Sequence, residues 1–200
     1  MTADLLITFI GYAFVTSITP GPNNTMLLAS GVNFGFRPSL PHILGITLGF
    51  TLMVLAVGLG LGAVFQIVPV LHSILRFLGA AYLLYLAWRI AGTGAPDDGT
   101  AGTTRPLSVM QAAAFQWVNP KAWIMAIGAV ATYAPQADYA VNIGVLTVLF
   151  ALVNGPCVAV WAAAGTSLRR FLTNPRKRRR FNIGMAVLLA ASILPILSGH

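Results

Sequence analysis

The sequence predicts an all-α membrane protein with six transmembrane helices, arranged as two inverted repeats of three helices. Three observations support this prediction. Hydrophobic residues make up 57% of the 200 residues and charged residues only 8%, and the mean hydropathy is +0.81. A soluble domain cannot hide this much apolar surface. The apolar residues fall into six long runs, and proline motifs interrupt the first and the fourth of these runs.

The six apolar runs are the predicted membrane spans, because a spanning helix takes about 20 predominantly apolar residues. They are Leu5–Gly31, Pro41–Phe65, Val70–Ala91, Val109–Ala134, Tyr139–Ser167 and Ile183–Leu197. Between the third and fourth spans, residues 92–108 are rich in Gly and Thr and contain Asp97 and Asp98, which is typical of a flexible linker. We therefore expect one integral membrane domain over residues 1–200, with a first repeat at 1–91 and a second at 109–200.

Basic residues are distributed unevenly over the connections between spans. Arg37, Arg89 and Arg105 follow the first and third spans, and seven Lys and Arg lie in Arg169–Arg180 after the fifth. The other connections and both tails carry none. Because basic connections stay in the cytoplasm, both termini are expected on the periplasmic side of a bacterial inner membrane. The cluster Arg169–Arg180 is expected to contact anionic lipid. Nucleic-acid binding is not expected, because the charge is not spread over a soluble surface.

Proline interrupts two spans at corresponding positions. A proline within a helix removes one backbone hydrogen bond and frees a carbonyl that lipid cannot satisfy. Thr19-Pro20-Gly21-Pro22-Asn23-Asn24 does this in the first span, and Asn119-Pro120-Lys121 does it in the fourth. In the fifth span, Pro156 also removes a hydrogen bond. Three spans separate the first two breaks, so the halves enter the membrane in opposite senses. Paired broken helices in inverted repeats point to a transporter's binding site near the bilayer midplane.

The half-helix after each break is expected to direct unpaired N–H groups and the positive end of its dipole into the space between the repeats. Asparagine side chains and the charge of Lys121 would add further groups that receive a carboxylate. The candidate substrate-binding residues are Pro20, Gly21, Pro22, Asn23, Asn24, Gln116, Asn119, Pro120, Lys121 and Asn154. Two alternatives remain open. The prolines are packing kinks, or the fourth span starts later and Lys121 lies near the cytoplasmic interface.

Other reactive side chains do not form a recognisable site in the sequence. His42, His72 and His200 are scattered and Cys157 is the single cysteine, so no catalytic residues, metal site or cofactor are expected. The four Asp lie in tails or loops, which leaves His42 as a weak candidate for a proton carrier. The alternatives to a transporter are a membrane-embedded scaffold or subunit and an intramembrane enzyme. Gly45 and Gly49 favour close helix contacts, and a homo-oligomer is compatible with this composition.

Several motifs resemble the LysE/RhtB family of amino-acid exporters. They are Thr19–Asn24 followed by Ser30-Gly31 and Phe34-Gly35, then Gly79–Leu83 before Trp88, and then Phe115–Lys121. The match runs the length of the chain. The resemblance implies an efflux protein of the cytoplasmic membrane for a neutral or small amino acid or derivative, coupled to proton antiport. The general pattern is similar to the cysteine and O-acetylserine exporters, while homoserine, threonine and leucine remain open as substrates.

Overall fold

The computed structural model describes residues 1–62, 69–93 and 105–194. Within these ranges the regular structure consists of helices alone. The helices are α1 (Ala3–Ile18), α2 (Pro22–Phe34), α3 (Phe36–Ala56), the π-helical turn η1 (Val57–Leu61), α5 (Pro69–Gly92), α6 (Val109–Gln116), α7 (Pro120–Tyr133), α8 (Tyr139–Arg169) and α9 (Pro175–Ala191). The predicted span ends Phe65 and Leu197, the linker residues Asp97 and Asp98, and His200 lie outside the described residues.

Three helices in the described part of the chain are long and apolar enough to cross a membrane. They cover Phe36–Leu61, Ser73–Gly92 and Tyr139–Arg169. The pair formed by α1 and α2 adds a fourth if this pair, bent by 55°, counts as one span. The remaining helices α6, α7 and α9 have 8, 14 and 17 residues, and each of them alone is too short to cross the membrane. An all-α protein with several apolar spans is therefore confirmed, and the number six and the inverted repeats stay predictions.

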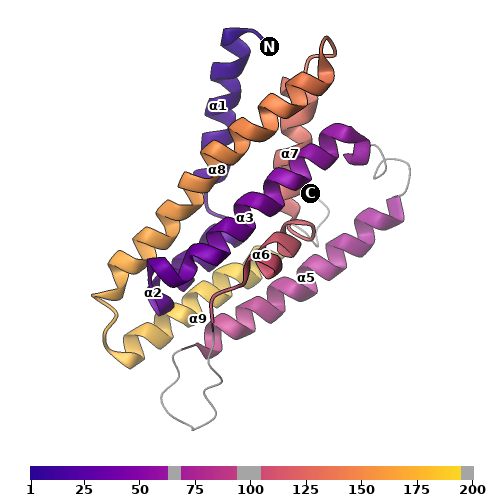
Figure 1. Ribbon diagram of the computed structural model, residues 1–200. Helices are drawn as coiled ribbons and strands as arrows, with labels where there is room; N and C mark the ends of the chain where they lie inside the picture. Colours follow the sequence, from indigo (N-terminus) through magenta and orange to yellow (C-terminus); the bar gives the residue numbers. More distant parts are fainter. Residues whose placement is uncertain (63–68, 94–104, 195–200) are drawn as a thin grey trace.

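The long helices α3, α5 and α8 run along the molecule, and the shorter helices fill the spaces beside them (Figure 1). Helix α8 packs against α1, α2 and α3, and α9 packs against α5 and α2. Buried apolar side chains form two clusters. One contains Leu27, Leu83 and Leu189 from α2, α5 and α9, and the other contains Phe9 and Phe150 from α1 and α8. The two helix breaks lie where these clusters meet.

Glycines allow several of these helices to touch backbone to backbone. A Cβ atom added at Gly31 of α2 would overlap the carbonyl oxygen of Ala162 in α8, and one at Gly165 would overlap that of Leu28. Gly45 and Gly49 of α3 lie equally close to the backbone of α6, against Val109 and Ala113. The predicted close contacts at Gly45 and Gly49 are therefore confirmed.

One helix is continuous as predicted, and another starts earlier than predicted. Helix α8 continues through Pro156, as the predicted span Tyr139–Ser167 requires, because a membrane helix tolerates the loss of one backbone hydrogen bond. Helix α9 begins at Pro175, well before the predicted Ile183, and the Asn174 side chain caps it by accepting a hydrogen bond from the Arg176 N–H at 2.9 Å. Most of the basic cluster therefore lies in the first turns of a helix and not in a loop.

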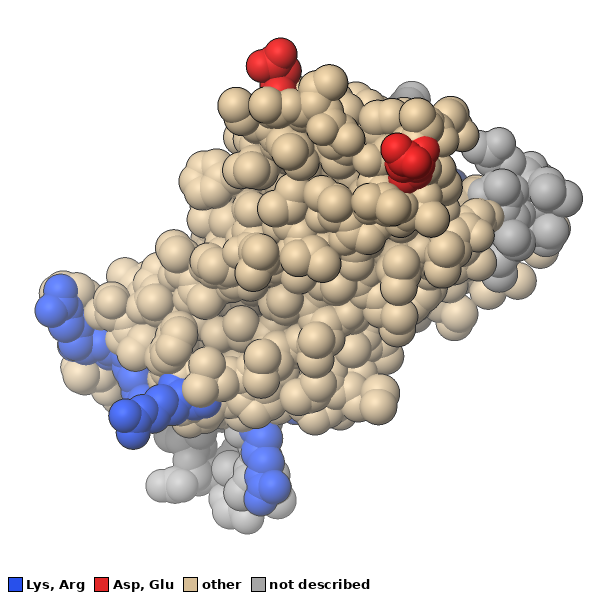
Figure 2. Space-filling model, turned by 45° about the horizontal axis from the view of Figure 1, so that its top comes forward, with Lys and Arg blue, Asp and Glu red and all other residues tan. Residues whose placement is uncertain are grey.

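Charge is separated along the molecule. Figure 2 shows basic side chains gathered at one end and acidic side chains toward the other. The basic end contains the end of α8 and the start of α9, where Arg169 lies beside Gly35. The N-terminal ammonium group lies at the start of α8, where it donates a hydrogen bond to Asn142 Oδ1 at 3.3 Å. The acidic residue Asp138 directly precedes this helix. The N-terminus therefore lies at the end opposite the basic cluster.

Candidate functional site

The two predicted helix breaks lie side by side in the structure. The first separates α1 from α2 at residues 19–21, and the second separates α6 from α7 at residues 117–119. The side chains of Asn23 and Gln116 join them, because each amide donates a hydrogen bond to the other, at 2.8 and 3.2 Å. Ninety-three positions separate these two residues in the sequence. The fold thus brings both proline motifs to one place.

Lys121 connects the start of α7 to the first break. Its Nζ donates hydrogen bonds to the Thr19 carbonyl oxygen at 2.8 Å, to Thr19 Oγ1 at 3.0 Å and to the Pro20 carbonyl oxygen at 3.2 Å. The positive charge therefore lies at the carboxyl end of α1, where the helix dipole is negative. Gly21 makes this approach possible, because a Cβ atom there would lie 2.8 Å from Lys121 Cδ.

The carbonyls freed at the first break all have partners. Thr19 Oγ1 donates to the Thr16 carbonyl at 3.1 Å, and the Trp161 indole N–H of α8 donates to the Ile18 carbonyl at 3.1 Å. The Asn24 amide donates to the Ser17 and Thr19 carbonyls at 2.9 and 2.7 Å. Trp161 lies in the middle of the fifth predicted span, and the packing of α8 against α1 brings it to the break.

The second break is a tight turn that closes on itself. The N–H groups of residues 117, 118 and 119 each donate to the carbonyl three positions earlier, and this satisfies the freed Gln116 carbonyl. The Asn119 side chain caps α7 by accepting from the Lys121 N–H at 3.2 Å. The Trp123 indole donates to the Trp117 carbonyl at 2.9 Å.

A cavity of about 320 Å³, including its open mouth, lies between the two breaks. We call it the break cavity. Most of the predicted site residues line it, namely Gly21, Asn23, Asn24, Gln116, Asn119, Lys121 and Asn154. Pro20, Pro22 and Pro120 shape the backbone around the cavity and are not among its lining residues. The other lining residues are Thr16, Ser17, Phe50, Ala122, Met125 and Val158.

These other lining residues were not predicted from the sequence. Thr16 and Ser17 lie just before the first break. Their short distance from Pro20 in the sequence could have identified them as lining residues. Phe50 and Val158 lie in the middle of unbroken apolar helices, and nothing local distinguishes them from neighbours that face lipid. Only the tertiary packing of α3 and α8 brings them to the cavity.

Two buried acceptors in the break cavity have no hydrogen-bond partner. They are Asn24 Oδ1 and Asn154 Oδ1. The Asn154 amide N–H donates to Ser17 Oγ at 3.2 Å, which leaves its oxygen free. Leaving a buried acceptor unpaired is costly, so these oxygens suit a ligand that donates hydrogen bonds. The described residues that line the cavity include no Asp or Glu, and the part of the chain that the structure describes contains no cluster of metal-binding side chains.

A bundle of apolar helices around a polar cavity made by broken helices defines a membrane transporter of the translocator class. The chain belongs to the LysE type translocator family, whose sequence profile matches residues 14–193. This confirms the resemblance described above and makes the chain a multi-pass inner-membrane transporter rather than an enzyme.

Several relatives match over nearly their whole length. The chain is 34% identical over 194 residues to the cysteine/O-acetylserine efflux proteins of Escherichia coli (strain K12), Escherichia coli O1:K1 / APEC and Shigella sonnei (strain Ss046). Each match covers 94% of this chain and 95% of the relative. No solved structure matches the chain.

Proposed function

We propose that the chain exports a small neutral amino acid or derivative, in the class of cysteine and O-acetylserine, from the cytoplasm. The matching relatives are named as efflux proteins for these two molecules. One observation supports the proposal most directly. The break cavity has a positive charge on Lys121 and unpaired acceptors on Asn24 and Asn154, which complement the carboxylate and the ammonium group of a free amino acid.

The carboxylate binds at Lys121 and the first turn of α2. Gly21 precedes this helix and offers no side-chain cap, so the N–H groups of its first turn are available to an anion. In the structure, the Lys121 ammonium donates hydrogen bonds to oxygens of Thr19 and Pro20. A carboxylate competes for these hydrogen bonds, so substrate binding changes what holds the first break in place.

The ammonium group binds at the unpaired oxygens of Asn24 and Asn154. Neutral acceptors suit a group that must also be released, because no carboxylate holds it with a full charge.

The two halves of the chain act as inverted repeats that rock around the break cavity. If spans one to three correspond to spans four to six, α1 corresponds to α6 and α3 corresponds to α8. The contact between α1 and α8 is then equivalent to the contact between α6 and α3, and both contacts occur. The same correspondence pairs α3 with α8 and α5 with α9, which also pack together. These four contacts support the repeat.

The basic end of the molecule faces the cytoplasm in this proposal, and both termini face the periplasm. Arg169–Arg180 then contacts anionic lipid of the inner leaflet. Export proceeds by proton antiport. Lys121 is the ionisable side chain among the described residues that line the break cavity, so it is the first candidate to exchange a proton there.

The test replaces Lys121 with Met and measures accumulation of radiolabelled cysteine in inside-out membrane vesicles with an acidic lumen. A charge-assisted hydrogen bond contributes about 1.5–3 kcal/mol. We therefore expect accumulation to fall by roughly 10- to 100-fold. Collapsing the pH gradient should abolish accumulation by the wild type.

Lys177→Met is the matched control, because it removes the other lysine of the chain, which is exposed in the first turns of α9. It should transport like the wild type. Normal transport by Lys121→Met at equal membrane levels would reject Lys121 as a substrate ligand and favour the prolines as packing kinks. Accumulation that persists without a pH gradient would reject proton antiport.

A further inference from the structure

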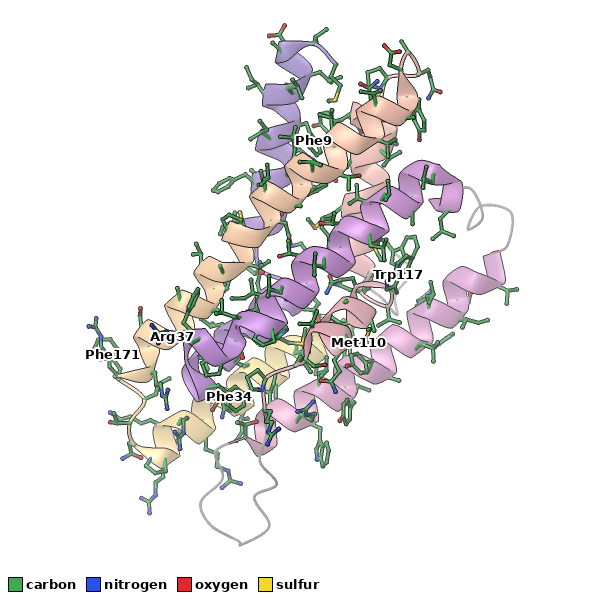
Figure 3. All side chains as sticks on the ribbon, in the orientation of Figure 1. Phe9, Phe34, Arg37, Met110, Trp117 and Phe171 are labelled. Carbon is green, nitrogen blue, oxygen red and sulfur yellow. The ribbon has the colours of Figure 1, made fainter. Side chains whose placement is uncertain are left out.

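A second cavity lies at the basic end of the molecule. It measures about 440 Å³ with its open mouth and is lined by the last turns of α2 and α5, by His42 of α3 and by residues 105–107. We call it the inner cavity. No described residue lines both cavities, but α2 contributes to each, and its Asn24 and Ser30 are about 9 Å apart along the helix axis. Figure 3 shows Phe34, which lines the inner cavity, well apart from Trp117 at the second break.

His42 is the least expected residue in the inner cavity. Its side chain is 2% exposed, and neither ring nitrogen has a hydrogen-bond partner. Buried polar groups in proteins are nearly always paired, and leaving one unpaired is costly. A neutral imidazole offers one donor and one acceptor. A ligand in the inner cavity that donates a hydrogen bond would satisfy the acceptor nitrogen.

Ser30 adds a second acceptor to the inner cavity. Ser39 Oγ donates its only hydrogen to the Gly35 carbonyl at 2.8 Å. The hydrogen bond of 2.7 Å between Ser30 and Ser39 must therefore use the hydrogen of Ser30. The lone pairs of Ser30 Oγ stay free, and Ser30 lines the cavity together with His42.

Two arginines give the inner cavity its charge. Arg89, at the end of α5, and Arg105 both line it, and Arg89 Nη2 donates to the Arg105 carbonyl oxygen at 3.3 Å. The described lining residues include no Asp or Glu that could neutralise them. Guanidinium groups bind carboxylates through paired hydrogen bonds, so this part of the cavity suits an anionic group.

We infer that the inner cavity is a second binding site for the free amino acid. The amino acid binds there before it reaches the break cavity. Its carboxylate binds Arg89 and Arg105, and its ammonium group donates to His42 and Ser30. This inference rests on the proposed function and on its orientation, which places the inner cavity at the cytoplasmic side. A lipid headgroup that carries an anionic group could use the same arginines, so the test separates these two sources.

The experiment measures equilibrium binding of radiolabelled L-cysteine, under reducing conditions, to the purified protein in phosphatidylcholine nanodiscs. We expect the wild type to bind two molecules per chain and His42→Leu to bind one. Arg89→Gln combined with Arg105→Gln should weaken one of the two sites at least tenfold. The arginine variant also covers the case in which His42→Leu does not fold, because Arg105 is exposed. Arg37→Gln is the matched control, since Arg37 is exposed at the same end and does not line the cavity.

The pattern across variants separates this inference from the proposed function. If Lys121→Met loses one site while His42→Leu and the arginine variant keep two, the inner site is rejected and the break site stands. If His42→Leu loses one site while Lys121→Met keeps two, the break site is rejected and the inner site stands. A fall to one bound cysteine when phosphatidylglycerol replaces phosphatidylcholine would assign the inner cavity to a lipid headgroup and overturn the inference.

Discussion

The two helix breaks around the break cavity differ in what holds them. At the second break, three consecutive N–H groups bond to carbonyls three positions earlier, and the Asn119 cap and the Trp123 indole complete the turn. Every one of these partners lies within a few residues of the break. At the first break, Asn24 is also local, but Lys121 comes from α7 and Trp161 from α8. The second break is therefore built locally, whereas the first depends on tertiary contacts.

This difference suggests which break responds to substrate. A turn closed by its own backbone keeps its shape when neighbouring side chains move. A break held by a lysine and an asparagine that also face the cavity changes its partners when a ligand competes for them. We therefore expect the first break to adjust during transport and the second to serve as a fixed support. Three pairs of variants test this difference.

Asn24→Ala should give the largest effect on stability. It removes a donor from the carbonyl of the buried Ser17, and an unsatisfied buried group costs about 1–3 kcal/mol; the Thr19 carbonyl also loses a donor but keeps Lys121. Asn119→Ala at the second break removes only a helix cap, which costs about 1 kcal/mol. Thermal unfolding in detergent should thus show a lower Tm for Asn24→Ala than for Asn119→Ala. Equal shifts would mean that both breaks depend on their asparagine alike.

The sequence predicts the breaks well because proline acts locally. The missing N–H of Pro20, Pro22 and Pro120 removes backbone hydrogen bonds, and both predicted breaks are confirmed. At Pro156 the same loss leaves α8 continuous, in keeping with the predicted span Tyr139–Ser167. The start of α9 was placed too late, because hydropathy reports membrane burial and not helix formation. Asn174 and Pro175 are the local signal for its true start.

The partners of the break cavity were harder to predict. The sequence identifies the residues in and next to the proline motifs, since they are unusual for a membrane span. It does not identify Phe50, because the distance of this residue to the first break depends on how α3 packs. The neighbourhood of His42 and Arg89 was likewise hidden, since the two residues lie in different helices of one apolar bundle.

Gly21→Ala should slow transport with little loss of stability. The added methyl group would lie 2.8 Å from Lys121 Cδ, so the flexible lysine must leave its position at Thr19 and Pro20. A shift of about 1.4 kcal/mol in the transport barrier would reduce the rate roughly tenfold. Gly11→Ala is the matched control, because a Cβ atom at Gly11 has no neighbour within 4 Å. Initial rates of cysteine accumulation in inside-out vesicles are the measurement, and equal rates for the two variants would contradict the proposed position of Lys121.

Trp161→Phe and Trp123→Phe make the smallest change, because each removes one indole N–H from a carbonyl at one break and keeps an aromatic ring in place. A lost hydrogen bond of this kind costs about 0.5–1.5 kcal/mol, so both variants should fold with similar Tm. Transport should separate them. Trp161 ties the adjustable first break to α8, so its loss should change the initial rate by a few-fold, while Trp123→Phe should stay near the wild-type rate. If Trp123→Phe slows transport more than Trp161→Phe, the second break is the one that moves, and the roles assigned to the two breaks must be exchanged.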